Sequence, residues 1–201
     1  MLGGMTAEIL LALLGFAFVT SITPGPNNLM LLASGANFGL RRTVPHMLGI
    51  GAGFVVLVAL TGVGAMRLFD LWPPARPLLT AGGALWMCWL ACRIACTASP
   101  VQGPAAGRPL TFLQAAAFQW VNPKAWTMAL TAVTLYAPDR SLAAVLTVAA
   151  VFGAVNLPAV SLWAVLGVHV GRWLNAPGRL RAFNLTMAAL LLASLWPVLA
   201  G

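Results

Sequence analysis

Two prolines and a glycine interrupt an apolar stretch near the start of the chain, in the sequence SITPGPNNLM at residues 21–30. Pro24 and Pro26 have no amide N–H, so the carbonyls about one turn earlier lose their helical donors. Thr23 and Gly25 precede these prolines and are pushed toward extended backbone. Pro26 can begin a new helix, because a missing N–H costs nothing at the first helical position. The stretch therefore predicts a helix that ends and begins again within a few residues.

A second proline break, Asn122-Pro123-Lys124, follows about half a chain later, with Asn122 lying 98 residues after Pro24. Asparagine is a good helix N-cap and proline favours the next position, so we expect a helix to start here. Lys124 is the one charged residue between positions 109 and 138. A cation near the middle of a membrane span costs about 2.5–3.5 kcal/mol on insertion scales and is usually functional.

The two breaks together predict a binding site. Each break exposes freed carbonyls on one side and a helix N-terminus on the other, and a membrane tolerates such groups only around a polar cavity. Helix N-termini and a lysine favour an anionic group, such as the α-carboxylate of an amino acid. The freed carbonyls and the amides after the first break would receive its ammonium group. The predicted substrate-binding residues are Thr23, Pro24, Gly25, Pro26, Asn27, Asn28, Asn122, Pro123 and Lys124.

Simpler explanations stay open for both breaks. Prolines commonly do no more than kink a helix, and a lysine can extend its charge from a helix to the membrane surface. Lys124 has no carboxylate at a comparable depth, because Glu8, Asp70 and Asp139 all lie near the ends of apolar runs. Its partner is therefore a ligand, a cluster of carbonyls, or nothing if the lysine is deprotonated.

The composition is that of a membrane protein. Hydrophobic residues make up 61% of the 201 residues and charged residues 7%, against about 25% charged in a typical soluble domain. The net charge of +8 comes from basic residues scattered singly or in pairs between apolar runs. Nucleic-acid binding would require a basic stripe with interleaved aromatic residues, which the sequence lacks. We expect a lipid bilayer, and no nucleic acid, as the partner of this chain.

The apolar runs predict an all-α integral membrane protein, since a spanning helix needs about 20 mostly apolar residues. Residues 97–109, TASPVQGPAAGRP, form a linker between a first three-helix repeat, 1–96, and a second, 110–201. Three spans per half require a repeat to be inverted in the membrane, as in many transporters, and the breaks fall in helices 1 and 4. The six predicted transmembrane helices cover residues 7–35, 44–66, 75–95, 110–136, 141–170 and 180–199.

The basic residues of the short loops predict the orientation. With the N-terminus outside, seven arginines lie on the cytoplasmic side and three lie outside, and the reverse topology inverts this ratio. Both termini are therefore expected outside, and the linker 97–109 inside. The cytoplasmic set is Arg41, Arg42, Arg93, Arg108, Arg172, Arg179 and Arg181, and the outer set is Arg67, Arg76 and Arg140.

Two stretches carry a resemblance to a known family: Pro24-Gly25-Pro26-Asn27 with Gly35, Gly39, Arg41, Arg42, Gly49 and Gly53 after it, and residues 112–124, ending in Asn-Pro-Lys. They resemble the two signatures of the lysine-exporter (LysE/RhtB) family of amino-acid exporters. The resemblance covers nearly the whole chain in length, span count and motif order. It implies export of amino acids or close derivatives across the bacterial inner membrane, driven by the proton motive force. The third and sixth spans depart from the family, with Ala91 in place of an expected glycine and few glycines near the C-terminus.

Histidine and cysteine residues suggest less specific roles. His46, near the start of the second span, is a proton-coupling candidate, although a structural histidine is the more common case. Cys88, Cys92 and Cys96 share one helix face, and three thiols could bind a soft metal such as Cu(I). A metal exporter therefore stays open, but small residues on a helix face more often serve packing.

The remaining features of the spans predict packing. Asn156 and Pro158 are expected to kink the fifth span, and Trp163 to pack against a neighbour or anchor the helix at an interface. Five glycines are expected to let helices approach closely, with a conformational hinge as the less common alternative. They are Gly35, Gly39, Gly49, Gly51 and Gly53.

A secondary transporter is the leading prediction. A membrane-embedded enzyme would need a Ser/His or Asp/Asp pair or an H-E-x-x-H metal sequence, and the chain has none of these. A channel-like pore or a scaffold stays open, because broken helices also build pores. The sequence predicts no cofactor or resident metal and leaves a homodimer open. With no carboxylate at a span centre to pair with a cationic side chain, we expect the substrate to be a neutral, in particular aliphatic, amino acid.

Overall fold

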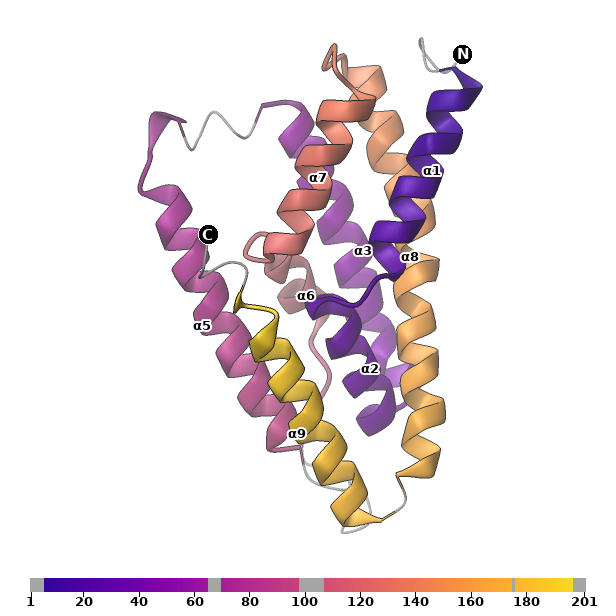
Figure 1. Cartoon of the computed structure of the whole chain (residues 1–201), viewed down its shortest axis with the longest axis vertical. Coiled ribbons are helices and arrows are strands. Elements are labelled where there is room, and N and C mark those ends of the chain that lie inside the picture. The colour runs from indigo at the N-terminus through magenta and orange to yellow at the C-terminus, as the bar shows by residue number, and fades with distance from the viewer. Residues whose placement is uncertain (1–5, 65–69, 98–106, 175, 197–201) are drawn as a thin grey trace.

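The computed structural model describes residues 6–64, 70–97, 107–174 and 176–196, and every regular element in these ranges is a helix. The all-α class predicted from the sequence is confirmed. Most of the helices run roughly along one long axis (Figure 1). In chain order they are α1 (Ala7–Ile22), α2 (Pro26–Phe38), α3 (Leu40–Gly62), α5 (Ala75–Ala95), α6 (Phe112–Phe118), α7 (Pro123–Tyr136), α8 (Leu142–Trp173) and α9 (Pro177–Ala193).

The first predicted break lies between α1 and α2. The chain leaves the helix after Ile22 and re-enters one at Pro26. Gly25 precedes α2 with φ −179° and ψ 177°, the extended backbone expected of a residue before proline. The chain bends by 55° between the two helices. The break that Pro24 and Pro26 predict is confirmed.

The second predicted break lies between α6 and α7. α6 ends at Phe118, a turn covers residues 119–121, and α7 begins at Pro123. Asn122 has extended backbone, and its Oδ1 accepts a hydrogen bond of 3.1 Å from the backbone N–H of Lys124. This is N-cap geometry, as the sequence predicts.

Among the described residues, three helices are long and apolar enough to cross a membrane, and counting the bent α1–α2 pair as one span makes four. α9 has 17 residues, slightly fewer than the roughly 20 that a span needs. The six-helix inverted repeat therefore stays a prediction. The second predicted span, expected from residue 44, begins earlier, because α3 starts at Leu40. Residues 98–106 of the predicted linker lie outside the described residues.

α2 packs along α8, and this is the most extensive helix contact in the described part of the bundle. Glycines face the contact from both sides. A Cβ on Gly35 would meet the backbone oxygen of Ala164, and a Cβ on Gly167 would meet the backbone oxygen of Leu32. Only glycine at these two positions lets the helix backbones touch, as is common between transmembrane helices.

The other predicted glycines have different roles. Gly49 and Gly53 on α3 lie against the backbone of α6, so close approach is confirmed there as it is at Gly35. Gly51 makes only ordinary contact, with its nearest neighbour 3.6 Å from a built Cβ. Gly39 has no neighbour within 4 Å and instead adopts φ +77°, a left-handed conformation that turns the chain from α2 into α3. The close-approach prediction is wrong for Gly39 and Gly51.

Buried side chains hold the bundle together in two main groups. One group joins α1, α3, α7 and α8 and includes Phe54 and Phe152, whose rings meet edge to face at 5.2 Å. The other joins α2, α3, α5, α6, α8 and α9 and includes Met30, Met87 and Phe118. The first break connects α1 in one group to α2 in the other, and the second connects α6 to α7 in the same way. Packing in the two groups therefore fixes the positions of the broken helix ends.

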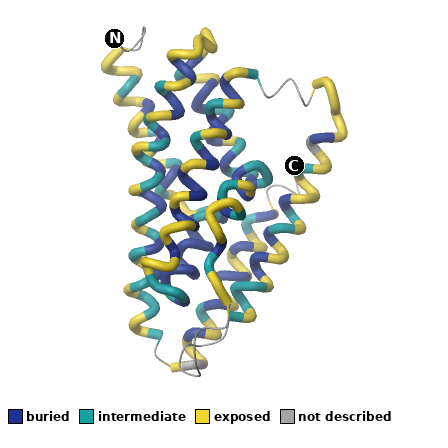
Figure 2. The backbone as a smooth tube through the Cα atoms, turned by 180° about the vertical axis from the view of Figure 1, so that it is seen from behind, coloured by how far each residue is buried: buried dark blue, intermediate teal, exposed yellow. Residues whose placement is uncertain are grey.

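The outer faces of the helices carry large apolar side chains. Figure 2 shows exposed positions along the outside of nearly every helix, and Leu11, Leu85 and Leu113 are among the exposed residues. Soluble monomers rarely expose such extensive apolar surface, whereas hydrocarbon solvates it. The surface fits a protein that lies in a bilayer.

Candidate functional site

Lys124, at the start of α7, joins the two helix breaks. Its Nζ donates hydrogen bonds to the backbone oxygen of Thr23 at 2.7 Å, to Thr23 Oγ1 at 3.0 Å and to the backbone oxygen of Pro24 at 3.4 Å. The lysine side chain runs over Gly25, where a Cβ would lie 2.7 Å from its Cδ. These oxygens lie at the C-terminal end of α1, where the helix dipole favours a cation. In this structure a cluster of oxygens is therefore the partner of Lys124.

Side chains also satisfy the other backbone oxygens at the end of α1. Asn28 Nδ2 donates to the backbone oxygens of Ser21 at 2.9 Å and Thr23 at 2.7 Å. Trp163, on α8, donates from Nε1 to the backbone oxygen of Ile22 at 3.0 Å. An unpaired carbonyl in hydrocarbon costs several kcal/mol. Because each backbone oxygen in residues 21–24 has a side-chain donor, the chain can break its helix within a membrane.

A pair of amides ties the second break to the first. Asn27 Nδ2 donates to Gln119 Oε1 at 2.8 Å, and Gln119 Nε2 donates back to Asn27 Oδ1 at 3.2 Å. Gln119 is fully buried and also donates to the backbone oxygen of Ala115 in α6. The start of α2 is thus fixed to the end of α6.

α8 contributes a polar residue to the same region. Asn156, on α8, donates from Nδ2 to Ser21 Oγ at 3.1 Å, and both side chains are buried. The sequence predicts Asn156 only as part of a kink, and Trp163 only as a packing or interface residue. Their hydrogen bonds to the end of α1 were not predicted. A buried asparagine and tryptophan, each with an N–H that needs an acceptor, are the signal that could have pointed to a polar partner nearby.

A small cavity lies where the breaks meet. The starts of both α2 and α7 line it, through residues that include Gly25, Asn27, Asn28, Asn122 and Lys124. Its volume of about 20 Å³ holds about one water molecule and no amino acid.

Several polar groups around this cavity have no partner. No side chain caps α2 in the described chain, so the N–H groups of Asn27 and Asn28 lack a helical acceptor. The buried Oδ1 atoms of Asn28 and Asn156 also have no partner among the described residues. Two helix N-termini, a cation and unpaired amide oxygens therefore surround one point, which is the chemistry of a site for a zwitterion.

The structure brings the predicted substrate-binding residues together. Thr23 and Pro24 bind Lys124, Pro26 and Pro123 begin the two helices, and the others line the cavity. That these residues bind a substrate stays a prediction.

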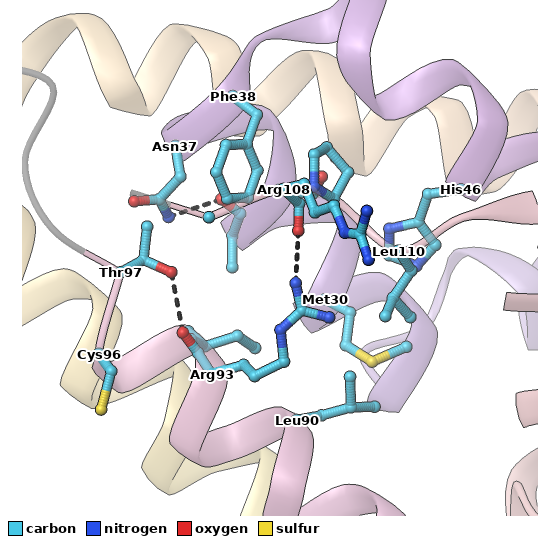
Figure 3. Close-up of a pocket in the computed structure, with 15 residues that line it drawn as sticks. Met30, Asn37, Phe38, His46, Leu90, Arg93, Cys96, Thr97, Arg108 and Leu110 are labelled. Atoms are coloured by element: carbon cyan, nitrogen blue, oxygen red, sulfur yellow. Dashed lines mark hydrogen bonds between the residues drawn. The ribbon is translucent and has the colours of Figure 1, made fainter. Parts of the chain in front are cut away.

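His46 lies elsewhere, in a second and larger cavity. This cavity has a volume of about 240 Å³ and lies between α2, α3, α5 and residues 107–110 (Figure 3). His46 is 2% exposed, and neither ring nitrogen has a partner among the described residues.

The three cysteines do not form a metal site. Cys88, Cys92 and Cys96 are free and exposed along α5 and its C-terminal end. Within the described ranges, no three His, Cys, Asp or Glu side chains gather closely enough to hold a metal ion.

Comparison with known proteins gives the class of the molecule. The family described as "LysE type translocator" matches residues 18–194, a stretch that contains both helix breaks. The chain belongs to this family. The resemblance found in the two proline signatures is thereby confirmed, and with it the assignment to membrane transporters of the amino-acid-exporter type and not to enzymes.

Several curated relatives of this LysE-type chain share one name. It is 29% identical over 190 residues to the "Cysteine/O-acetylserine efflux protein" of Escherichia coli O139:H28, a match that covers 94% of this chain and 96% of the relative. The protein of the same name in Escherichia coli K12 is 29% identical over 189 residues, with 93% and 95% covered. The Shigella flexneri serotype 5b protein matches to the same extent. No solved structure matches this chain.

Proposed function

We propose that this protein is a secondary transporter that exports small neutral amino acids across the bacterial inner membrane, driven by the proton motive force. The transmembrane domain would consist of two inverted three-helix repeats, 1–96 and 110–201, joined by a cytoplasmic linker at 97–109. Family membership supports the transporter class. The matching positions of the two helix breaks, each near the start of its half, support the repeat.

The substrate proposal joins two lines of support. The relatives at 29% identity are named for efflux of cysteine and O-acetylserine, which are both amino acids without a charged side chain. The chain has only three carboxylates, Glu8, Asp70 and Asp139, and none lines the cavity at the breaks. A cationic side chain such as that of lysine would find no countercharge there. We therefore expect neutral side chains, small polar or aliphatic, to be preferred.

The observation that carries the site proposal is that the starts of α2 and α7 line one cavity together with Lys124. We place the substrate carboxylate there, bound by Lys124 and by the free N–H groups at the start of α2. The ammonium group would bind the carbonyls of residues 21–24 and the oxygens of Asn27 or Asn28. Since Lys124 and Asn28 occupy those carbonyls in this structure, substrate binding requires Lys124 to leave Thr23. The small cavity then opens.

His46 is the proposed proton-coupling residue. It is buried without a hydrogen-bond partner among the described residues, and histidine is the side chain that changes charge most readily near neutral pH. Both termini would lie outside, and a homodimer would fit the exposed apolar faces.

Counterflow in proteoliposomes tests this proposal. Purified protein is reconstituted into vesicles loaded with unlabelled substrate, and uptake of labelled O-acetylserine, leucine or lysine is followed over time. A carrier accumulates label transiently, whereas a channel only equilibrates it. Accumulation of O-acetylserine or leucine that responds to an imposed pH gradient supports the proposal. Counterflow of lysine in preference to leucine would contradict the substrate class, and equilibration alone would contradict a carrier.

A further inference from the structure

The larger cavity (Figure 3) is lined by the C-terminal ends of α2 and α5. Figure 1 shows these helix ends at the end of the bundle opposite the N-terminus of α1. The cavity's volume of about 240 Å³ compares with about 20 Å³ at the helix breaks, so of these two cavities it is the one with room for an amino acid. Its lining includes the charged or polar residues His46, Arg93 and Arg108 and the apolar residues Met30, Leu90 and Leu110.

Two arginines make this cavity positive. Arg93 and Arg108 both line it, and no carboxylate does. Arg93 Nη2 donates to the backbone oxygen of Arg108 at 2.7 Å, and its guanidinium lies 4.9 Å from the centre of the Trp89 ring. These contacts orient the guanidinium but use few of its five N–H donors. Guanidinium groups match the shape of a carboxylate and bind it through two hydrogen bonds.

His46 adds an unsatisfied polar group to the same cavity. A neutral imidazole has one donor and one acceptor nitrogen, and neither has a partner among the described residues although the side chain is 2% exposed. Two other buried polar residues that line the cavity are already paired, Asn37 with Asn184 and Ser34 with Thr43. Burying an unpaired polar group is costly, and because both ring nitrogens are buried, the His46 side chain must turn toward the cavity to bond with a group that enters it.

We propose that this cavity is a substrate-binding site distinct from the helix breaks, which holds an amino acid at the inner end of the protein. Arg93 and Arg108 bind the carboxylate, the acceptor nitrogen of His46 receives the ammonium group, and the side chain packs against Met30, Leu90 and Leu110. The identity of the ligand rests on the proposed export function.

The placement fits the direction of transport. The arginines counted as cytoplasmic include Arg93 and Arg108, so the positive-inside rule puts the cavity at the cytoplasmic end. An exporter receives its substrate from that side. The amino acid would bind here first and reach the helix breaks afterwards.

A native cysteine reports on the cavity. Cys96 lines it and is exposed, so a protein with Cys88→Ser and Cys92→Ser keeps a single thiol at the site. The purified protein is placed in lipid nanodiscs, and the rate of maleimide labelling is measured against increasing ligand. The probes are O-acetylserine, leucine, 4-methylpentanoate (leucine without the ammonium group) and 3-methylbutylamine (leucine without the carboxylate). Binding in the cavity is expected to slow labelling of Cys96.

The order of the probes tests the roles of the residues. O-acetylserine or leucine should protect Cys96 from labelling. For the same protection, 3-methylbutylamine should need a concentration at least roughly tenfold higher, because it lacks the carboxylate that the arginines bind. Arg93→Gln and Arg108→Gln should each weaken protection by leucine roughly tenfold or more. His46→Leu should weaken protection by leucine but leave 4-methylpentanoate unchanged. Arg172→Gln, which removes a charge from the end of α8 outside the cavity, is the matched control and should behave like the parent protein.

The outcomes separate this inference from the proposed function. Equal protection by leucine and 3-methylbutylamine, or unchanged protection in both arginine variants, overturns the cavity as a carboxylate site even if the protein exports amino acids. Carboxylate-dependent protection together with an absence of counterflow supports the site and contradicts the export function.

Discussion

Replacing Lys124 with methionine tests the site at the helix breaks most directly. Methionine keeps a long, unbranched stem that can lie over Gly25, but it removes the ammonium group that bonds to Thr23 and Pro24. A hydrogen bond to a charged group contributes roughly 1.5–3 kcal/mol, while a cation within a membrane costs about 2.5–3.5 kcal/mol on insertion scales. Lys124 makes three such contacts, but the backbone oxygen of Thr23 keeps its hydrogen bond from Asn28. The loss of the donor to Pro24 and the gain from removing the cation therefore nearly cancel. The amount of folded protein in the membrane should therefore change little.

Transport should change much more. If Lys124 binds the substrate carboxylate, its loss removes a charged hydrogen bond of roughly 1.5–3 kcal/mol, which corresponds to a rise of roughly 10- to 150-fold in the substrate concentration at half-maximal rate. The measurement is the export rate against internal substrate concentration, normalised to protein in the membrane. Arg181→Met, which removes a positive charge from the exposed surface of α9, is the control and should leave the curve unchanged.

A structural role for Lys124 would give a different result. The variant would then lose protein from the membrane or melt at a lower temperature, but the protein that remained would keep its apparent affinity. If Lys124→Met exports at the wild-type rate and affinity, the lysine only closes the end of α1 and the proposed site is wrong.

Three further changes test other parts of the structure. Gly25→Ala places a methyl group against the lysine side chain, 2.7 Å from its Cδ, and should lower apparent substrate affinity as Lys124→Met does. Gly15→Ala is the control, because a Cβ there has nothing within 4 Å, and it should leave the affinity unchanged. Gly35→Ala pushes a methyl group into the backbone of α8 and should destabilise the protein by roughly 1–3 kcal/mol, seen as a lower melting temperature; an unchanged value would contradict the close packing. The third change adds single cysteines to a chain without native cysteines. In intact cells, an impermeant maleimide should label a cysteine at position 201 but not one at position 104. Equal labelling of the two would refute the six-span topology.

The helix breaks could be predicted because their cause is local. A proline lacks its N–H wherever it stands, so Pro24, Pro26 and Pro123 interrupt or begin a helix without help from the rest of the fold. The asparagine cap on α7 is local as well, since Asn122 Oδ1 reaches an amide only two residues away. Such features need no knowledge of how the helices pack.

The partners of the freed carbonyls could not be predicted, because they depend on packing. Trp163 reaches Ile22 across 141 residues of sequence, and Asn156 reaches Ser21 across 135. A single sequence gives no sign of which face of α8 meets the end of α1. Gly39 shows the reverse error, since its spacing fits a packing glycine while its backbone serves a turn.

The same carbonyls cannot serve Lys124 and a substrate at once, and this limits how transport can work. The backbone oxygen of Thr23 already accepts from both Lys124 and Asn28, which uses its two lone pairs. If the proposed site is correct, an incoming ammonium group would replace the lysine, and a carboxylate that attracts the lysine away from Thr23 would make that exchange favourable. A zwitterion supplies both groups, whereas an amine or a carboxylic acid supplies only one. A site at the break would thus favour amino acids over amines or carboxylic acids, independently of the side chain that they carry.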